Sequence, residues 1–465
     1  MSSFQGSASE AAAISARLDR LPATAYIWRL VVLLSLGGFF EFYDLFFTGY
    51  IVPGLVRSKL LANVAIGIFT GPAAFVAATF GGLWIGTLVL GFVADRFGRR
   101  SIFTLSLLWY CVATAIMAFQ DTGLGVVLWR LIAGIGIGVE LVTIDTYVAE
   151  LVPKDLRGRA FAVNQTIQFA VVPVVAFLAY ELVPIAPLGF DGWRWVVLIG
   201  SAGALVVWFI RLGVPESPRW LVQHGRLEAA EQVTALMERR VQADLGAAPL
   251  PPPLTHAASE AHGGGSFAEI FEPPYRTRTL MLVVFQFFQT VGFYGFANWV
   301  PTLIAQQGIN LSASLLYSFV IAIANPFGPL LAYTVADRIE RKWMIVLAAI
   351  GIAVFGLLFS QQRTSGLLIL FGVLITLCNN TLSFSFHAYQ SELFPTRVRA
   401  RAVGFVYSFS RISTVFMSFM IAFFLQNGGV PAVFGFIAVA MLIVVLSIGI
   451  FGPRVNHLQL EAISH

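Results

Sequence analysis

Seven ionisable side chains interrupt the long apolar stretches of this sequence, and their chemistry needs an explanation. Each charge within a membrane span costs roughly 2.5 to 3.5 kcal/mol on insertion scales, so it requires a partner or a water-filled cavity. Buried acids and bases of this kind form proton relays and hold charged solutes. The seven are Glu41, Asp44, Arg130, Glu140, Asp145, His387 and Arg411.

The positions of Asp44 and Arg130 predict that the two side chains meet inside the membrane. Asp44 lies about nine residues before the end of its span and Arg130 about five after the start of its own, which gives similar depths at 1.5 Å per residue. Gly134 and Gly138 follow on the Arg130 face, where small residues let helices approach closely. We interpret Asp44 as a proton carrier controlled by Arg130. A permanent structural ion pair is the alternative.

Three further acids are candidates for proton coupling. Glu41 lies one turn before Asp44, and like charges at that spacing do not both stay ionised cheaply. We expect one of the two to be protonated or paired with an arginine. Glu140 and Asp145 lie about 140° apart on one helix, so at most one of them points at a given neighbour.

Arg411 and His387 are candidates for contact with a solute. Arg411 lies near the middle of its span, which contains no acid, and its planar guanidinium suits a carboxylate. We therefore predict an anion anchor, with pairing to Glu140 or another buried acid as the alternative. His387 titrates near physiological pH, which suits a proton or substrate gate. A packed, hydrogen-bonded histidine is the alternative for this residue.

Amide and aromatic side chains supply uncharged candidates for the same cavity. Such groups either contact substrate or only join helices, the latter contributing about 0.6 kcal/mol each on average. Trp299 is the aromatic residue that we expect to touch substrate. The candidates are Gln165, Gln168, Gln286, Gln289, Tyr294, Asn298, Trp299, Asn325, Asn379 and Asn380.

These residues must be positioned by membrane helices. Of the 465 residues, 58% are hydrophobic and 11% charged, against about 25% charged in soluble domains. Apolar stretches of about 20 residues recur, and backbone groups in lipid are satisfied within helices. The predicted spans are 28–53, 66–94, 101–119, 126–149, 160–183, 194–213, 279–304, 314–336, 343–361, 366–390, 403–425 and 431–452. The sequence therefore predicts an all-α membrane protein with twelve transmembrane helices.

The distribution of cations predicts the orientation. With the N-terminus in the cytoplasm, most of the 29 Lys and Arg fall in cytoplasmic segments, as the positive-inside rule expects. Both termini are then cytoplasmic, and the net charge of +5 needs no nucleic-acid partner. No cleaved signal peptide is evident. The cations on the opposite side are Arg57, Lys59, Arg194 and Arg363.

The two halves of the sequence are copies of one unit. A shift of 242 residues places GFVADRFGRR (91–100) on YTVADRIERK (333–342), and YVAELVPKDLRGRA (147–160) on YQSELFPTRVRARA (389–402). A duplicated six-helix unit with an even span count is related by an axis along the membrane normal. We therefore expect two pseudo-symmetric six-helix bundles.

The predicted domains follow from this repeat: a cytoplasmic tail (1–26), an N-terminal bundle (27–212), a cytoplasmic linker with a short helix (213–278), a C-terminal bundle (279–452) and a second cytoplasmic tail (453–465). The helix of the linker is expected at 225–241, followed by a mobile Pro- and Gly-rich stretch at 248–266. Residues 9–22 predict an amphipathic helix on the inner membrane surface. The first eight residues are equally compatible with a disordered tail.

Four motifs resemble the major facilitator superfamily: GFVADRFGRR, RLIAGIGIG (130–138), ELVPKDLRG (150–158) and PESPRWL (215–221). The last three are most similar to its sugar-porter and organic-solute branches. The resemblance implies two bundles that rock around a central cavity. It also implies that an acid at the position of Asp44, near an arginine matching Arg130, serves proton coupling.

Two other stretches bear on the substrate. FYDLFFTGY (42–50) and FSRIS (409–413) resemble metabolite:proton symporters and the organic-ion branch. Similar members carry aromatic acids, nicotinate or sugar acids. Sugar porters usually have paired glutamines in the seventh span, whereas here Phe288 precedes Gln289, which weakens a sugar assignment.

The resemblance also implies a gate on the cytoplasmic side, where charged contacts between loops hold the outward-facing state. Each half of the chain carries one copy. The gate residues are Gly91, Asp95, Arg96, Gly98, Arg99, Glu150, Arg157, Asp337, Arg338, Arg341, Glu392 and Arg399.

Together these features predict a secondary active transporter that moves a small organic anion, such as an aromatic acid or sugar acid, with protons by alternating access. A sugar or drug facilitator or exporter and a non-transporting solute sensor are the alternatives. We expect no enzyme activity, metal or other cofactor, because the sequence lacks nucleophile, metal-ligand and nucleotide-binding patterns. We expect a monomer in a bacterial inner membrane.

Overall fold

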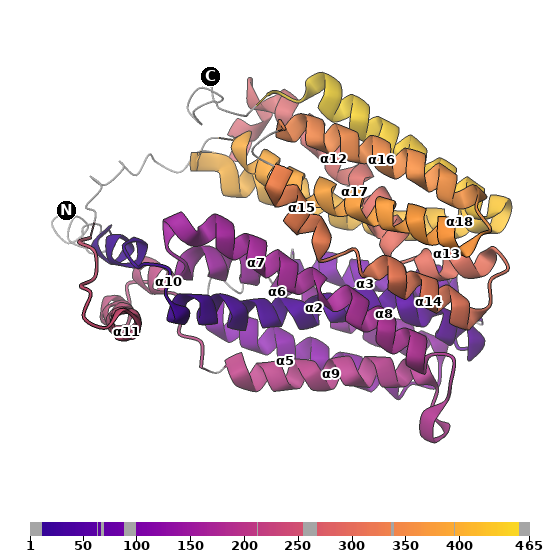
Figure 1. Cartoon of the computed structure of the whole chain (residues 1–465), viewed down its shortest axis with the longest axis horizontal. Helices are drawn as coiled ribbons and strands as arrows, with labels where there is room; N and C mark the ends of the chain where they lie inside the picture. The colour runs from indigo at the N-terminus through magenta and orange to yellow at the C-terminus, as the bar shows by residue number, and fades with distance from the viewer. Residues whose placement is uncertain are drawn as a thin grey trace.

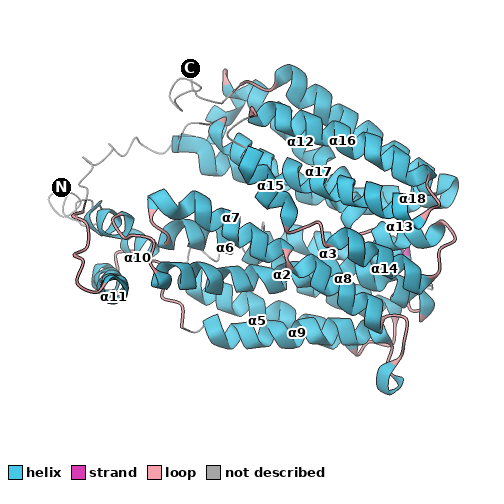
Figure 2. Cartoon of the chain, in the orientation of Figure 1, coloured by secondary structure: helices cyan, strands magenta, loops and turns pink. Residues whose placement is uncertain are grey.

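The structure is a computed structural model of the chain. It describes residues 12–62, 64–66, 69–87, 99–211, 213–253, 267–335, 339–394 and 396–454. Almost all of this part is helical, as Figure 2 shows. A two-residue antiparallel pair, β1 (Ala65–Ile66) and β2 (Phe69–Thr70), is the only sheet among the described residues.

The first half of the chain forms one set of packed helices. Where a predicted span is broken, two shorter helices replace one. The set contains α2 (Ala25–Arg57), α3 (Gly71–Ile85), α5 (Arg99–Ala118), α6 (Gly123–Leu151), α7 (Arg157–Phe169), α8 (Val171–Leu182) and α9 (Gly192–Arg211), with short turns η2 (Lys154–Leu156) and η3 (Pro187–Gly189).

The second half forms a matching set. Its members are η4 (Phe267–Phe271), α12 (Tyr275–Ala297), α13 (Val300–Gln306), α14 (Leu311–Ala322), α15 (Phe327–Val335), α16 (Arg341–Gln361), α17 (Ser365–Glu392) and α18 (Thr396–Phe451). The continuous α18 contains both of the last two predicted spans. Its direction changes at Gly429 (φ 65°, ψ −163°), two residues before Pro431, a backbone conformation that glycine tolerates and most residues do not.

The two sets lie side by side as separate bundles in Figure 1. We call the end that carries α10 (Pro218–Gln223) and α11 (Leu227–Leu245) the proximal end and the opposite end the distal end. Packing between the bundles includes Gly49 against the backbone of Asn298, where a Cβ would overlap it. Phe177 also packs on Phe319, with ring centroids 5.4 Å apart. The predicted all-α fold of two six-helix bundles is confirmed.

Large apolar side chains cover the outer faces of the helices. Leu105, Phe209, Leu347 and Ile450 are each more than half exposed. In water such surfaces would be costly, whereas a lipid environment accommodates them. Their position on long apolar helices agrees with the predicted membrane spans.

A small cap of polar helices covers the proximal end of the N-terminal bundle. This proximal cap comprises the helix at residues 12–19, α10 and α11. Its apolar core contains Leu18, Trp220 and Met237, each at most 2% exposed. The sequence predicts an amphipathic helix at residues 9–22. Its described part is helical at residues 12–19, and Leu18 packs into the same apolar cluster as the side chains of α11.

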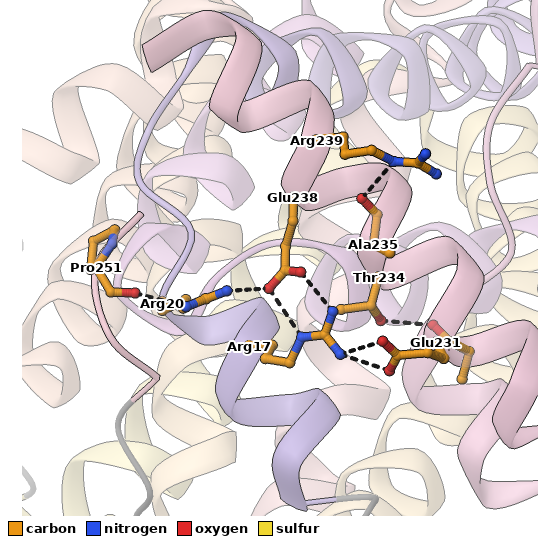
Figure 3. Close-up of polar contacts among 9 residues, drawn as sticks. Arg17, Arg20, Glu231, Thr234, Ala235, Glu238, Arg239 and Pro251 are labelled. Atoms are coloured by element: carbon orange, nitrogen blue, oxygen red, sulfur yellow. Dashed lines mark hydrogen bonds and ion pairs between the residues drawn. The ribbon is translucent and has the colours of Figure 1, made fainter. Parts of the chain in front are cut away.

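Charged side chains join the first helix of the cap to α11 (Figure 3). Arg17 donates from Nη1 to Glu231 Oε2 at 2.6 Å and from Nη2 to Glu238 Oε2 at 2.6 Å. Arg20 Nη2 donates to Glu238 Oε1 at 2.5 Å. Glu231 and Glu238 lie seven residues apart, on one face of α11. We call these four residues the Arg17 clamp.

Candidate functional site

Asp44 of α2 and Arg130 of α6 form the ion pair that their depths predict. Arg130 Nη1 donates to Asp44 Oδ2 at 2.6 Å, and Nη2 donates to the backbone oxygen of Asp44 at 2.6 Å. Their side chains are 5% exposed for Asp44 and 0% for Arg130. The guanidinium also lies over the ring of Phe47, 4.6 Å from its centroid. The pair is thus enclosed within the N-terminal bundle.

Three threonines complete this site, and none of them is among the residues predicted from the sequence. Arg130 Nε donates to Thr79 Oγ1 at 2.9 Å, and Nη2 donates to Thr48 Oγ1 at 2.7 Å. Thr114 Oγ1 donates to Asp44 Oδ1 at 2.9 Å. The site therefore draws on α2, α3, α5 and α6. Thr48 lies one turn after Asp44, a spacing that could have indicated it.

Glycines allow α3 and α6 to approach closely enough to form the site. A Cβ on Gly134 would lie 2.5 Å from the backbone oxygen of Thr79. A Cβ on Gly82 or Gly138 would overlap the backbone of the facing helix. Small residues at such a crossing permit direct backbone contact. The predicted role of Gly134 and Gly138 thus extends to positioning Thr79 beside Arg130.

Arg411 of α18 lies in the C-terminal bundle between two tyrosines. Its Nη1 donates to the Tyr294 hydroxyl at 3.1 Å and its Nη2 to the Tyr407 hydroxyl at 3.0 Å. The guanidinium carbon also lies 4.9 Å from the centroid of the Tyr407 ring. Arg411 is 3% exposed. Its two side-chain hydrogen-bond partners in the described part of the chain are therefore neutral hydroxyls.

Tyr294 connects this arginine to the other bundle. The ring of Tyr294 lies 4.8 Å from the ring of Phe80 on α3, measured between centroids. Glu41 of α2 is fully buried and close enough to Arg411 to interact with it electrostatically. The cluster of Arg411, Tyr294 and Tyr407 therefore lies at the interface between the bundles.

His387 of α17 belongs to the edge of the same cluster. Its ring lies 5.8 Å from that of Tyr407 and stacks on Phe386 at 4.1 Å, both measured between centroids. Its Nδ1 lies 2.8 Å from the backbone oxygen of Ser383 in the preceding turn. This hydrogen bond supports the packing interpretation of His387. His387 and Arg411 both contact the side chain of Tyr407.

A small central cavity lies between the two bundles. Its volume is about 20 Å³, roughly the space of one water. Phe46, Tyr50 and Val172 line it from the N-terminal bundle, and the amides of Asn325, Asn379 and Asn380 line it from the C-terminal bundle. Asn380 Nδ2 donates to the backbone oxygen of Asn325 at 3.0 Å. Asn379 Oδ1 is buried with no hydrogen-bond partner among the described residues.

The predicted glutamines lie in two places. Gln286 Nε2 donates to Gln390 Oε1 at 2.8 Å, and Gln289 Nε2 donates to Gln286 Oε1 at 3.1 Å, which forms a buried amide chain in the C-terminal bundle. Gln168 packs against Gly38, where a Cβ would overlap its side chain. Gln165 is half-buried on α7.

Asn298 and Trp299 lie at the break between α12 and α13. They are 1% and 2% exposed, and the side-chain nitrogens of both lack hydrogen-bond partners within the described chain. Neither residue lines the central cavity, whereas Trp299 lines a larger pocket at the distal end. The structure therefore separates Trp299 from the amides with which the sequence grouped it.

Only part of the predicted gate lies among the described residues. Arg341 and Glu392 form an ion pair within the C-terminal bundle. Arg157 Nη2 lies 3.6 Å from Asp19 Oδ1 of the proximal cap. Glu150 is half-buried near the end of α6.

The remaining predicted residues lie outside the described part of the chain, either entirely or in their side chains. They are Gly91, Asp95, Arg96, Gly98, Asp337 and Arg338, together with the side chains of Arg99, Glu140, Asp145 and Arg399.

Comparisons with known proteins agree with this architecture. Residues 30–465 match the family described as "Sugar (and other) transporter". The chain is 30% identical over 458 residues to the inner membrane metabolite transport protein YdjE of Escherichia coli, covering 97% of this chain and 98% of that protein. It is 26% identical over 448 residues to the niacin transporter NiaP of Acinetobacter baylyi, covering 96% and 98%.

A solved structure is similar over nearly the whole chain. The xylose transporter XylE from E. coli, in a partially occluded inward open conformation, matches with a TM-score of 0.74 at 22% identity. The match covers 94% of this chain and 100% of that chain. This chain is therefore an integral membrane transporter, not an enzyme, and belongs to the sugar (and other) transporter family of the major facilitator superfamily.

Proposed function

We propose that the protein is a proton-coupled symporter that carries a small organic anion by alternating access. In this proposal the proximal end faces the cytoplasm of a bacterial cell, with both termini inside, and the protein acts as a monomer in the inner membrane. The names of relatives support a small-solute substrate, since they include a niacin transporter and a D-xylose transporter.

Asp44 is proposed as the proton carrier, and the hydrogen bonds of Arg130 support this role. Neutralising one partner of a buried ion pair usually leaves the other charge buried and unpaired, which destabilises the protein by about 3 to 5 kcal/mol. Arg130 also donates to three neutral oxygens: the Asp44 backbone, Thr48 and Thr79. A protonated Asp44 therefore leaves the guanidinium with partners, which suits a pair that changes protonation better than a permanent one.

Arg411 is proposed as the anion anchor. Only two of its five N–H groups donate in its side-chain hydrogen bonds within the described chain, both to neutral tyrosine hydroxyls. A carboxylate that reached it would form charge-assisted bonds, which are stronger than neutral ones. Its position at the bundle interface makes it reachable when the bundles move apart.

The packing between the bundles supports a state that is closed at the distal end. Gly49 meets the Asn298 backbone there, and Phe177 meets Phe319. With the proximal end in the cytoplasm, this arrangement is closed toward the outside of the cell. Rocking of the bundles would separate these contacts and expose the central cavity to the outside.

The main support for the proposal is the placement of two buried charged groups. The Asp44–Arg130 pair is enclosed within the N-terminal bundle, and Arg411 is buried at the interface between the two bundles. Uptake of radiolabelled nicotinate and benzoate into proteoliposomes, with and without an inward proton gradient, tests it. We expect gradient-driven accumulation by the unaltered protein, and Asp44→Asn should abolish accumulation while solute exchange persists. The exposed control Glu181→Gln should behave like the unaltered protein. Equal accumulation without a gradient would refute proton coupling.

A sugar transporter is the second candidate, and the amide wall of the central cavity favours it. Asn325, Asn379 and Asn380 offer donors and acceptors suited to hydroxyl groups. The same proteoliposomes supplied with D-xylose decide between the two. Uptake of D-xylose that is unaffected by Arg411→Gln would favour this candidate over an organic anion.

A further inference from the structure

A second pocket lies between the bundles at the distal end, separate from the central cavity. Its volume is about 850 Å³, within the range of ligand sites. The end of α2 and the start of α3 form one wall, and α13, α14 and α18 form the other. We call it the distal pocket. Because both bundles contribute to it, its shape depends on how the bundles are arranged at this end.

The charge of the distal pocket selects for anions. Arg57 is the only ionisable side chain that lines it in the described chain, and the exposed Lys59 follows two residues later. Arg57 Nη1 donates to the backbone oxygen of Pro184, which leaves the rest of its guanidinium available. No acid lines the pocket within the described residues.

The walls of the pocket are mostly apolar but contain polar groups whose hydrogen bonds are not made. Trp299 Nε1 and Thr302 Oγ1 are buried and have no partner among the described residues. A buried polar group without a partner costs about 1 to 3 kcal/mol, and a hydrogen bond to a ligand would recover part of that cost. The two residues lie three positions apart at the start of α13, and their polar atoms are enclosed in the pocket wall, so a ligand bonds to them only when these side chains turn toward the pocket.

We propose that the distal pocket binds a small organic monoanion with an aromatic or other apolar body. Its carboxylate is held by Arg57 and its body packs against Trp299 and Leu311. A ligand that bridges both walls stabilises the distal-closed arrangement, because moving the bundles apart would break half of its contacts. High external concentrations of such an anion therefore slow transport. This site is distinct from Arg411 and does not depend on which solute the central cavity carries.

Thermal unfolding and binding isotherms of the purified full-length protein test the proposal with three matched probes: benzoate, benzamide and benzyl alcohol. We expect benzoate to raise the unfolding temperature in a saturable way and the two neutral probes to have little effect. Arg57→Gln should weaken benzoate binding about tenfold, the equivalent of one charge-assisted hydrogen bond. Arg363→Gln, an exposed cation of the distal end outside the pocket, should leave binding unchanged.

Two further variants separate the pocket from the proposed anion anchor. Thr302→Val and Trp299→Phe keep the apolar volume and remove a polar group, and each should weaken benzoate binding severalfold. Arg411→Gln removes the proposed anion anchor, so the benzoate binding that remains in this variant should still weaken about tenfold when Arg57→Gln is added. The proposal is overturned if Arg411→Gln abolishes binding while Arg57→Gln does not. It is also overturned if benzyl alcohol binds as well as benzoate, which would identify an apolar site for lipid or detergent.

Discussion

Arg130 binds Asp44 twice, once through the carboxylate and once through the backbone carbonyl, each at 2.6 Å. The second contact does not depend on the charge of Asp44. The arginine is therefore held at the same place on α2 whether the carboxyl is ionised or protonated. This relationship makes the surrounding threonines testable parts of the site.

Thr79→Val should destabilise the protein by about 1 to 3 kcal/mol, because the buried Nε of Arg130 loses its acceptor. Gradient-driven uptake should fall as well, since the guanidinium is no longer fixed from α3. Thermal unfolding and proteoliposome uptake measure the two effects. Thr104→Val is the matched control, because among the described residues that hydroxyl donates only to the backbone of Arg100 in its own helix, at an exposed position. Equal effects of the two variants would contradict this role for Thr79.

Gly134→Ala should displace α6 from α3, because its Cβ would lie 2.5 Å from the backbone oxygen of Thr79. Overpacking of this kind costs about 1 to 3 kcal/mol. We expect a lower unfolding temperature together with loss of proton-driven uptake. Gly404→Ala on α18 provides the control, since a Cβ added there would meet nothing within 4 Å, and alanine favours helix. Normal uptake by Gly134→Ala would show that the close approach is not needed.

Arg411→Lys should weaken the binding of a carboxylate solute about tenfold or more, although the charge is kept. Lysine cannot reproduce the planar fork that donates to both Tyr294 and Tyr407. Equilibrium binding of nicotinate measures the change, with Arg363→Lys as an exposed control. Tyr407→Phe should have a smaller effect in the same direction. Unchanged affinity in Arg411→Lys would remove the case for an anion anchor.

Arg17 and Glu238 of the Arg17 clamp should stabilise the proximal cap cooperatively. A double-mutant cycle of Arg17→Gln and Glu238→Gln should give a coupling energy of about 1 kcal/mol. Hydrogen exchange of residues 12–24 is the measurement, because release of the clamp frees that segment from α11. Arg239→Gln is the control, since Arg239 donates to the backbone oxygen of Ala235 in its own helix and to no other described residue (Figure 3). Additive effects of the two clamp variants would argue against direct coupling.

The clamp should also weaken in acid. Burial opposes ionisation of Glu238, but hydrogen bonds from Arg17 and Arg20 outweigh it and lower the pKa of this carboxyl. Because the folded pKa lies below the unfolded one, the stabilisation is complete above the ordinary glutamate pKa and is lost as pH falls through the lowered value. Faster exchange of residues 12–24 in acid than at neutral pH is therefore expected. Glu238→Gln should remove most of that pH dependence.

The fold is predictable because membrane helices leave a strong signal in sequence. Long apolar stretches define the spans, and the repeated motifs at 91–100 and 333–342 define the two bundles. The pairing of Asp44 with Arg130 is also predictable, since depth follows from residue position. Thr79 and Thr114 are not, because they approach from other helices whose rotation no sequence pattern specifies.

Positions near helix breaks are predicted less well. The sequence predicts one continuous span at 279–304, but the helix is interrupted at Asn298 and Trp299. The interruption changes the direction in which the following side chains point, so Trp299 lines the distal pocket instead of the central cavity. Tyr407 is absent from the predicted site although it lies one turn before Arg411, a spacing that places two side chains on one helix face.

The Arg17 clamp also has a consequence for biogenesis. Arg17 and Glu238 are 221 residues apart in the chain, so the arginine leaves the ribosome long before its partner is made. The six spans of the N-terminal bundle are synthesised in between, and the contact can form only after α11 has followed them. The clamp can therefore close only once the N-terminal bundle and α11 have been synthesised, and it can do so before the C-terminal bundle has been translated.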